Sequence, residues 1–135
     1  MTKCNQDPRT RPQIQVSVQG TTSAKALYDT GATVSVMSER TFMNIPQRDR
    51  PTMSKYAPLR LTGADNKAMT VRGSFDMNIR ILERTIRQEI HVVDGLTSDL
   101  MMGCDLIHTH GLGYNAIGRK PYYQDRRNWE EGRII

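Results

Sequence analysis

The stretch Leu27-Tyr28-Asp29-Thr30-Gly31-Ala32-Thr33-Val34-Ser35-Val36-Met37 decides how this sequence is interpreted. An apolar pair leads into an acid, a hydroxyl residue and a glycine, and a second apolar run follows. Such a turn holds a carboxylate rigidly between two strands, because glycine allows a tight backbone and a close approach of other atoms. Asp29 is therefore the candidate catalytic residue. Thr30, through its hydroxyl, and Gly31, through its backbone, are expected to support the turn.

A single carboxylate is only half of a hydrolytic site. Two carboxyl groups about 3 Å apart cannot both ionise, so they share a proton. The charged group takes a proton from water while the protonated group polarises a peptide carbonyl, a reaction that needs no metal and no cofactor. However, Asp-Thr-Gly or Asp-Ser-Gly occurs once, and the later acids Asp94, Asp99 and Asp105 lack this context. The partner of Asp29 is then Asp29 of a second copy, which predicts a symmetric homodimer.

Alternation of apolar and polar residues is clearest over 71–81 and 86–92, with a turn near Glu83-Arg84. This period of two predicts a pair of long strands joined as a hairpin. Shorter apolar runs predict strands near 14–18, 24–28, 33–37, 100–102 and 112–117. We therefore expect a mostly-β fold.

Two short helices are expected among these strands. Ser38 is placed to cap a helix over 39–44, and Gly111 is placed to end a helix over 104–110. Residues 46–58 contain three prolines and are expected to form a surface loop, and Gly63-Ala64-Asp65-Asn66 has the composition of a turn.

The ends of the chain lack these patterns. Residues 1–13 are polar and residues 118–135 are charged and aromatic without a clear period, so both are interpreted as extensions. A single domain is then expected over 14–117, since a chain of 135 residues is too short for two domains.

Composition narrows the function classes. The net charge of +5 comes from basic residues scattered among acids, without a zinc knuckle or a basic helix, so no specific nucleic-acid binding is expected. No apolar run approaches a membrane span and no secretory signal is visible. Cys4 and Cys104 are expected to be reduced thiols. His91, His108 and His110 are interpreted as surface residues, and no metal site is expected.

Leu27–Met37 resembles the active-site segment of retropepsins, the aspartic proteases of retroviruses and LTR retrotransposons. Two further segments follow in the family's order: Gly63-Ala64-Asp65-Asn66 at the turn of the substrate-covering flap, and Leu100-Met101-Met102-Gly103-Cys104-Asp105-Leu106-Ile107 behind the acid turn. The resemblance spans about 14–117. It implies a retropepsin-like acid protease fold, with a single-lobe monomer, a flap hairpin, a short C-terminal helix and a symmetric homodimer.

Departures from the retroviral pattern favour a retrotransposon-type member. Many retroviral members carry an acid after Gly-Ala, where this chain has Thr33, and the flap turn here has one glycine. The resemblance implies that substrate contacts come from the acid turn, the flap and the strand before Gly103. The candidate substrate-binding residues are Ala32, Thr33, Gly63, Ala64, Asp65 and Met101.

The leading hypothesis is an aspartic endopeptidase that processes a polyprotein of Gag-Pol type, with polypeptide substrates and a second copy of the chain as partners. A cytoplasmic location, or one within virus-like particles, is expected. The alternative is a retropepsin-like dimerisation or peptide-binding module with weak or lost catalysis, which the altered flap and Thr33 keep open.

Overall fold

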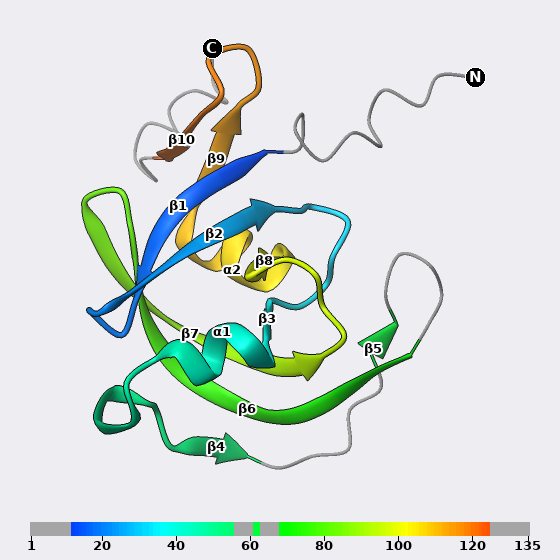
Figure 1. Cartoon of the computed structure of the whole chain (residues 1–135). Helices are drawn as coiled ribbons and strands as arrows, with labels where there is room; N and C mark the ends of the chain where they lie inside the picture. The colour runs from blue at the N-terminus through cyan, green and yellow to red at the C-terminus, as the bar shows by residue number, and fades with distance from the viewer. Residues whose placement is uncertain (1–11, 56–60, 63–67, 125–135) are drawn as a thin grey trace.

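Strands that are distant in the sequence lie side by side in the main sheet. A computed structural model describes residues 12–55, 61–62 and 68–124 (Figure 1). The main sheet of these residues has the strand order β1-β2-β8-β3-β7-β6-β4, with β5 paired to β6, and β9 and β10 form a second sheet. The strands are β1 Gln13–Val18, β2 Thr22–Tyr28, β3 Val36–Ser38, β4 Met53–Lys55, β5 Leu61–Thr62, β6 Ala68–Ile81, β7 Arg84–Asp94, β8 Leu100–Met102, β9 Leu112–Asn115 and β10 Lys120–Tyr123.

The predicted long hairpin is confirmed. β6 and β7 pair antiparallel from Thr70↔Asp94 to Ile81↔Arg84. Their alternating apolar residues point into the core, where Met77, Ile79 and Ile90 are fully buried. Burial of each such side chain contributes about 2 kcal/mol, so the alternation fixes which face of the hairpin meets the rest of the domain.

β8 lies between β2 and β3 although β2 and β3 are neighbours in the sequence. It runs parallel to β2 and antiparallel to β3. Leu100 and Met102 are fully buried, and Met101, on the opposite face, is half-buried. The loop from residue 29 to residue 35 must therefore pass around the end of β8. This insertion places the acid turn of β2 directly beside Gly103.

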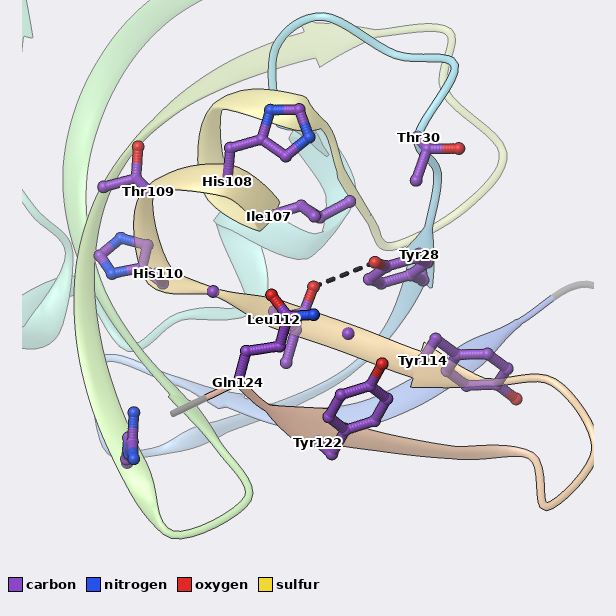
Figure 2. A pocket seen from close by; sticks show the side chains of 13 residues that line it. Tyr28, Thr30, Ile107, His108, Thr109, His110, Leu112, Tyr114, Tyr122 and Gln124 are labelled. Atoms are coloured by element: carbon purple, nitrogen blue, oxygen red, sulfur yellow. Dashed lines mark hydrogen bonds between the residues drawn. The ribbon is translucent and has the colours of Figure 1, made fainter. Parts of the chain in front are cut away.

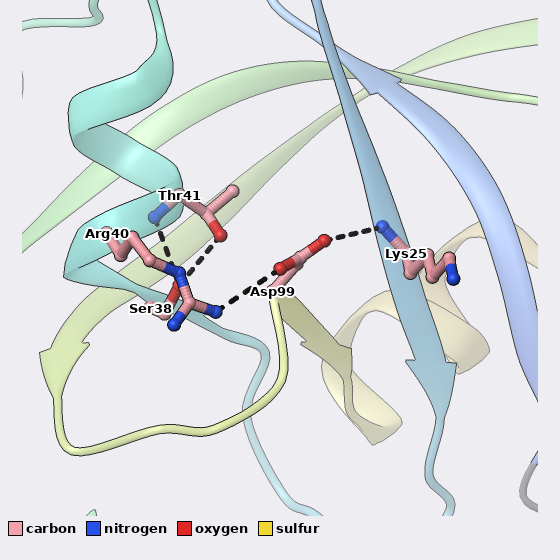
Figure 3. A network of polar contacts seen from close by, with 5 residues as sticks. All are labelled: Lys25, Ser38, Arg40, Thr41 and Asp99. Carbon is pink, nitrogen blue, oxygen red and sulfur yellow. Dashed lines mark hydrogen bonds and ion pairs between the residues drawn. The ribbon is translucent and has the colours of Figure 1, made fainter. Parts of the chain in front are cut away.

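Asp99 fixes the point where β8 enters the sheet (Figure 3). Its carboxylate accepts a hydrogen bond from the Lys25 main-chain N–H at 3.0 Å, and its carbonyl accepts one from the Ser38 N–H at 3.0 Å. Arg40 forms an ion pair with the same carboxylate at 3.6 Å. Asp99 thus joins β2 and the start of helix α1 (Glu39–Asn44) to β8.

The predicted helix over 39–44 is confirmed as α1, with Ser38 as its N-cap accepting from the Thr41 N–H. The segment 46–58 differs from the expected loop. It contains a 3₁₀ turn, η3 (Gln47–Asp49), and β4, which pairs with β6 at the edge of the sheet. An edge position accommodates prolines on either side of a three-residue strand.

The second predicted helix is α2 (Cys104–His110), and Gly111 ends it in the left-handed conformation at φ 66°. The strand expected over 112–117 is shorter, because β9 ends at Asn115. A turn then leads into β10, within the segment interpreted as a C-terminal extension. β9 and β10 lie at the top of the view in Figure 1, and α2 lies below them, nearer the centre.

The interpretation of His91 as a surface residue is wrong. His91 is 6% exposed, and its Nδ1 lies 2.7 Å from the Ser74 hydroxyl on β6. β7 is paired on both sides here, with Val36 of β3 and Ser74 of β6 opposite His91. The run from residue 90 to 93 is buried at every position. His108 is exposed and His110 half-buried. None of the helices in the described ranges is long and apolar enough to cross a bilayer.

Candidate active site

Asp29 lies at the first position after β2, where the chain leaves the sheet. Its main-chain N–H donates to the Met102 carbonyl at 3.0 Å, which continues the β2–β8 pairing by one step. Its carboxylate Oδ1 accepts from the Gly31 N–H at 2.9 Å, and its carbonyl accepts from the Ala32 N–H at 3.2 Å. The carboxylate is therefore held by its own turn while the residue remains partly exposed.

Gly31 leaves room for this closure. A Cβ at this position would lie 3.2 Å from the Asp29 Oδ1 that its own N–H binds. The Thr30 hydroxyl makes no hydrogen bond within the described part of the chain, and Thr30 is exposed. Main-chain groups hold the turn here, in place of the hydroxyl contact expected from the sequence.

The start of α2 fastens the second half of the turn. The Cys104 N–H donates to the Ala32 carbonyl at 2.8 Å, and the Asp105 N–H donates to the Thr33 carbonyl at 3.2 Å. The Cys104 thiol also approaches the Thr30 carbonyl at 3.1 Å. Three carbonyl groups of the turn are thus tied to the first two residues of the helix.

Gly103 makes this contact sterically possible. A Cβ on Gly103 would lie 2.6 Å from the Val34 carbonyl oxygen and 2.8 Å from the Ala32 carbonyl oxygen. Side-chain carbons do not approach backbone oxygens so closely, so the loop passes within reach of α2 only because residue 103 is glycine.

Ser35 and Asp105 form a polar centre beneath the turn that the sequence did not identify. The Ser35 hydroxyl donates to Asp105 Oδ1 at 2.6 Å and accepts from the Gly103 N–H at 2.9 Å. Asp105 Oδ2 accepts from the Ser35 N–H and from Gln88 Nε2, each at 3.2 Å. Ser35 is fully buried. The local sequence indicates this centre only through a serine between Val34 and Val36, because a buried hydroxyl needs a hydrogen-bond partner.

The predicted substrate-binding residues fall into two groups. Ala32 is half-buried and Thr33 is exposed, and both lie in the acid turn beside Asp29. Met101 lies in β8, half-buried between Leu27 and Val36 of the neighbouring strands. Gly63, Ala64 and Asp65 lie outside the described residues. β5 and the start of β6 do pair on either side of them, with Leu61 opposite Met69. Their contacts with a substrate stay predictions.

An open hollow of about 990 Å³ begins beside the acid turn and extends over α2, β9 and β10 (Figure 2). Tyr28 and Thr30, which flank Asp29 in the sequence, line one end of it, and Tyr114 and Tyr122 line another part. Burial raises the pKa of Tyr28, with smaller contributions in the same direction from Tyr122 and Cys104. No group of three or more potential metal ligands occurs among the described residues.

Comparison with known proteins identifies the family. The model of the family described as gag-polyprotein putative aspartyl protease matches residues 14–109. The chain belongs to this family. The match covers the acid turn, β8 and nearly all of α2, so the retropepsin resemblance of the sequence is confirmed. No curated protein matches the sequence.

Solved structures show the same fold. The retroviral protease-like domain of Ddi1 from Leishmania major is similar with a TM-score of 0.67 and 16% identity, covering 85% of this chain and 89% of that one. EIAV protease, solved in complex with the inhibitor HBY-793, is similar with a TM-score of 0.58 and 22% identity, covering 81% and 93%. The expected mostly-β, retropepsin-like fold is therefore confirmed, and at these identities the likeness concerns the fold alone.

Proposed function

We propose that this chain is a homodimeric aspartic endopeptidase in which Asp29 of each copy activates a shared water molecule. The main support for this proposal is the geometry of the acid turn. Asp29 ends β2, its carboxylate is oriented by the Gly31 N–H at 2.9 Å, and the residue stays accessible. A carboxylate that is both fixed and reachable suits general acid–base chemistry.

The second carboxylate is assigned to a second copy because the sequence has one Asp-Thr-Gly. A two-fold axis beside Asp29 brings the two acids together with the same surface on each chain. The Thr30 hydroxyl, which has no partner in the described part of its own chain, is then available to the other copy's turn.

In this mechanism one Asp29 carboxylate removes a proton from the water and the other, protonated, donates a hydrogen bond to the scissile carbonyl. The water oxygen attacks the carbonyl carbon, and the departing amine takes a proton as the C–N bond breaks. Ala32 and Thr33, in the same turn as Asp29, are assigned the role of aligning the peptide, and the segment 63–67 is assigned the role of covering it.

The substrate is proposed to be an extended polypeptide. The description of the matching family names a gag polyprotein, which supports polyprotein processing as the biological role. A chain of this kind would act in the cytoplasm or inside virus-like particles. Ala32 and Thr33 present no charge to the substrate, so substrate binding is expected to depend on main-chain contacts and apolar pockets.

The test is Asp29→Asn compared with Asp94→Asn, an acid-to-amide change on an exposed residue outside the turn. Each protein is incubated with an unfolded polypeptide from acidic to neutral pH at high salt, and the products are identified by mass spectrometry. We expect cleavage by the wild type and by Asp94→Asn, and none by Asp29→Asn, which remains a folded dimer by sedimentation. Cleavage by purified Asp29→Asn would refute the assignment.

A catalytically weak peptide-binding dimer is the second candidate, favoured by the neutral Thr33 at an exposed position beside Asp29. Pepstatin, a peptide with a hydroxyl group in place of the scissile bond, separates the two candidates. Tight binding of pepstatin without turnover of any peptide would support the binding module. Turnover that declines per chain on dilution would support the dimeric enzyme, since its site exists only in the dimer.

A further inference from the structure

Tyr28 connects the acid turn to a part of the molecule outside the main sheet. It is the last residue of β2 and directly precedes Asp29. Its hydroxyl donates to the Leu112 carbonyl on β9 at 3.0 Å (Figure 2). Its ring stacks on Tyr114, also on β9, with 5.7 Å between the ring centroids and 29° between the planes. One side chain therefore contacts β9 at two positions of the same edge.

The pairing of β9 with β10 explains why the Leu112 carbonyl is available. In an antiparallel pair, residues alternate between those that exchange hydrogen bonds and those that do not. The Gln124 N–H donates to the Gly111 carbonyl at 2.8 Å, so the next pair, Leu112–Tyr123, does not exchange main-chain hydrogen bonds. The same holds for Tyr114 and Pro121, which has no N–H.

The main-chain groups of Leu112 consequently point away from β10 and toward β2. Leu112 is 3% exposed, and a buried carbonyl without a donor is destabilising. The Tyr28 hydroxyl supplies that donor. Because burial raises the pKa of Tyr28, the phenol keeps its proton throughout acidic and neutral pH and remains a donor there.

Asp29 thus lies between two kinds of attachment. After it, Ala32 and Thr33 are tied to the start of α2 by main-chain hydrogen bonds. The residue before it is tied to β9 by a phenol and an aromatic ring, in addition to the pairing of β2 with β8. A displacement of β9 relative to the sheet is transmitted to the acid turn through Tyr28.

We propose that Tyr28 is a positioning residue, whose hydroxyl and ring lock the end of β2 against β9 and so set the direction of the Asp29 carboxylate. The proposal rests on the proposed function, in which two such carboxylates must meet across a dimer axis. Misplacement of a catalytic group by a fraction of an ångström lowers the rate without abolishing binding. Tyr28 therefore acts through Asp29 and is assigned no contact with substrate.

Tyr28→Phe and Tyr123→Phe are the matched pair that tests this role. Each removes one hydrogen bond from a phenol to a backbone carbonyl, at 3.0 Å for Tyr28 and 2.9 Å for Tyr123, which donates to Ile81. Only the Tyr28 contact adjoins the acid turn. The dimeric proteins are compared at concentrations above their dissociation constants, verified by sedimentation, with kcat and KM measured on one peptide and the Kd for pepstatin measured by calorimetry.

We expect Tyr28→Phe to lower kcat about tenfold and to weaken pepstatin binding by a similar factor, with KM within about twofold of the wild type. Tyr123→Phe is expected to retain kcat and pepstatin affinity. Equal losses in both variants would show a general loosening of the hairpin, and an unchanged kcat in Tyr28→Phe would show no positioning role. A rise in KM alone would indicate a substrate contact. Each of these three results overturns the proposal.

Tyr114→Leu provides a second route if Tyr28→Phe does not fold, because it removes the stacking partner and leaves the Tyr28 hydroxyl in place. A lower kcat supports the proposal and an unchanged kcat refutes it. Failure of the proposed function can be distinguished from failure of the role proposed for Tyr28. If the wild-type protein binds pepstatin but cleaves nothing, the proposed enzyme activity is refuted. The role of Tyr28 is then decided by comparing the pepstatin affinities of the variants. A wild-type protein that does neither refutes both.

Discussion

The acid turn and the β9–β10 hairpin adjoin each other, yet they are held by different kinds of interaction. The turn is fastened by main-chain hydrogen bonds, from Asp29 to Met102 and from Cys104 and Asp105 back to the loop. The hairpin lies outside the main sheet and is attached to it by the phenols of Tyr28 and Tyr123 and by Leu112, which is buried in the core. The turn therefore depends mainly on contacts between backbone segments, whereas the attachment of the hairpin depends on a few side chains.

Gly103→Ala is expected to cause the largest loss among changes to the turn. The added Cβ would lie 2.6 Å from the Val34 carbonyl oxygen, so β8, α2 and the loop cannot keep their present contact. Overpacking against backbone is expected to destabilise the protein by about 3 kcal/mol or more. Urea denaturation measures this difference.

Gly118→Ala is the matched control, because the nearest atom to its new Cβ is the Asn115 side chain at 3.7 Å. Its stability is expected to stay within about 0.5 kcal/mol of the wild type. Equal stabilities of the two variants would contradict the view that the turn depends on contact between backbone segments.

Asp105→Asn tests the polar centre that supports the same turn. Each carboxylate oxygen of Asp105 accepts two hydrogen bonds, from Ser35 and Leu106 on one side and from Ser35 and Gln88 on the other. An amide replaces one acceptor with a donor, so the two hydrogen bonds to that oxygen are lost. We expect a loss of about 2 kcal/mol of unfolding free energy and a lower activity at equal concentrations of folded protein.

Ser35→Ala sharpens the same comparison, since it removes the hydroxyl that joins Asp105 to the Gly103 N–H. Like Asp105→Asn, it should lower the unfolding free energy and the activity. Stability loss without any change in kcat in both variants would show that the centre supports the fold and has no influence on the acid turn.

The sequence predicted the elements whose signals are local. The alternation in β6 and β7, the Ser38 cap of α1 and the terminal Gly111 of α2 each follow from residues within one element. The acid turn was recognised because its residue types are specific to one chemistry. The family match then confirmed the fold that this resemblance implied.

Features built from distant residues could not be predicted in this way. Ser35 and Asp105 are 70 positions apart and meet only because β8 is inserted between β2 and β3. β10 is four residues long and contains Pro121, which lowers the strand signal although a proline fits the non-bonded position opposite Tyr114. His91 is buried where β7 lies between β3 and β6 within the sheet, a neighbourhood that the pattern of a single strand does not reveal.

His110 lies where the two regions meet, and its titration is the smallest effect we predict. Its Nε2 lies 3.2 Å from Gln88 Oε1, Gln88 in turn binds Asp105, and Gly111 follows it at the start of the hairpin. Burial lowers the pKa of His110, against opposing contributions from an Arg87 backbone hydrogen bond and from Asp105. The unfolded chain therefore binds this proton more readily than the folded one.

Stability from this group is present above its unfolded pKa of about 6.5 and is lost as the pH falls through the lowered folded value. His110→Gln keeps a nitrogen that can donate to Gln88 and removes the titration. As the pH falls from about 7.5 to about 5.5, we expect the wild type to lose more unfolding free energy than His110→Gln. His108→Gln, a change at an exposed position of the same helix, should follow the wild type. If His110→Gln also followed the wild type, the link from α2 through Gln88 to the turn would not respond to protonation.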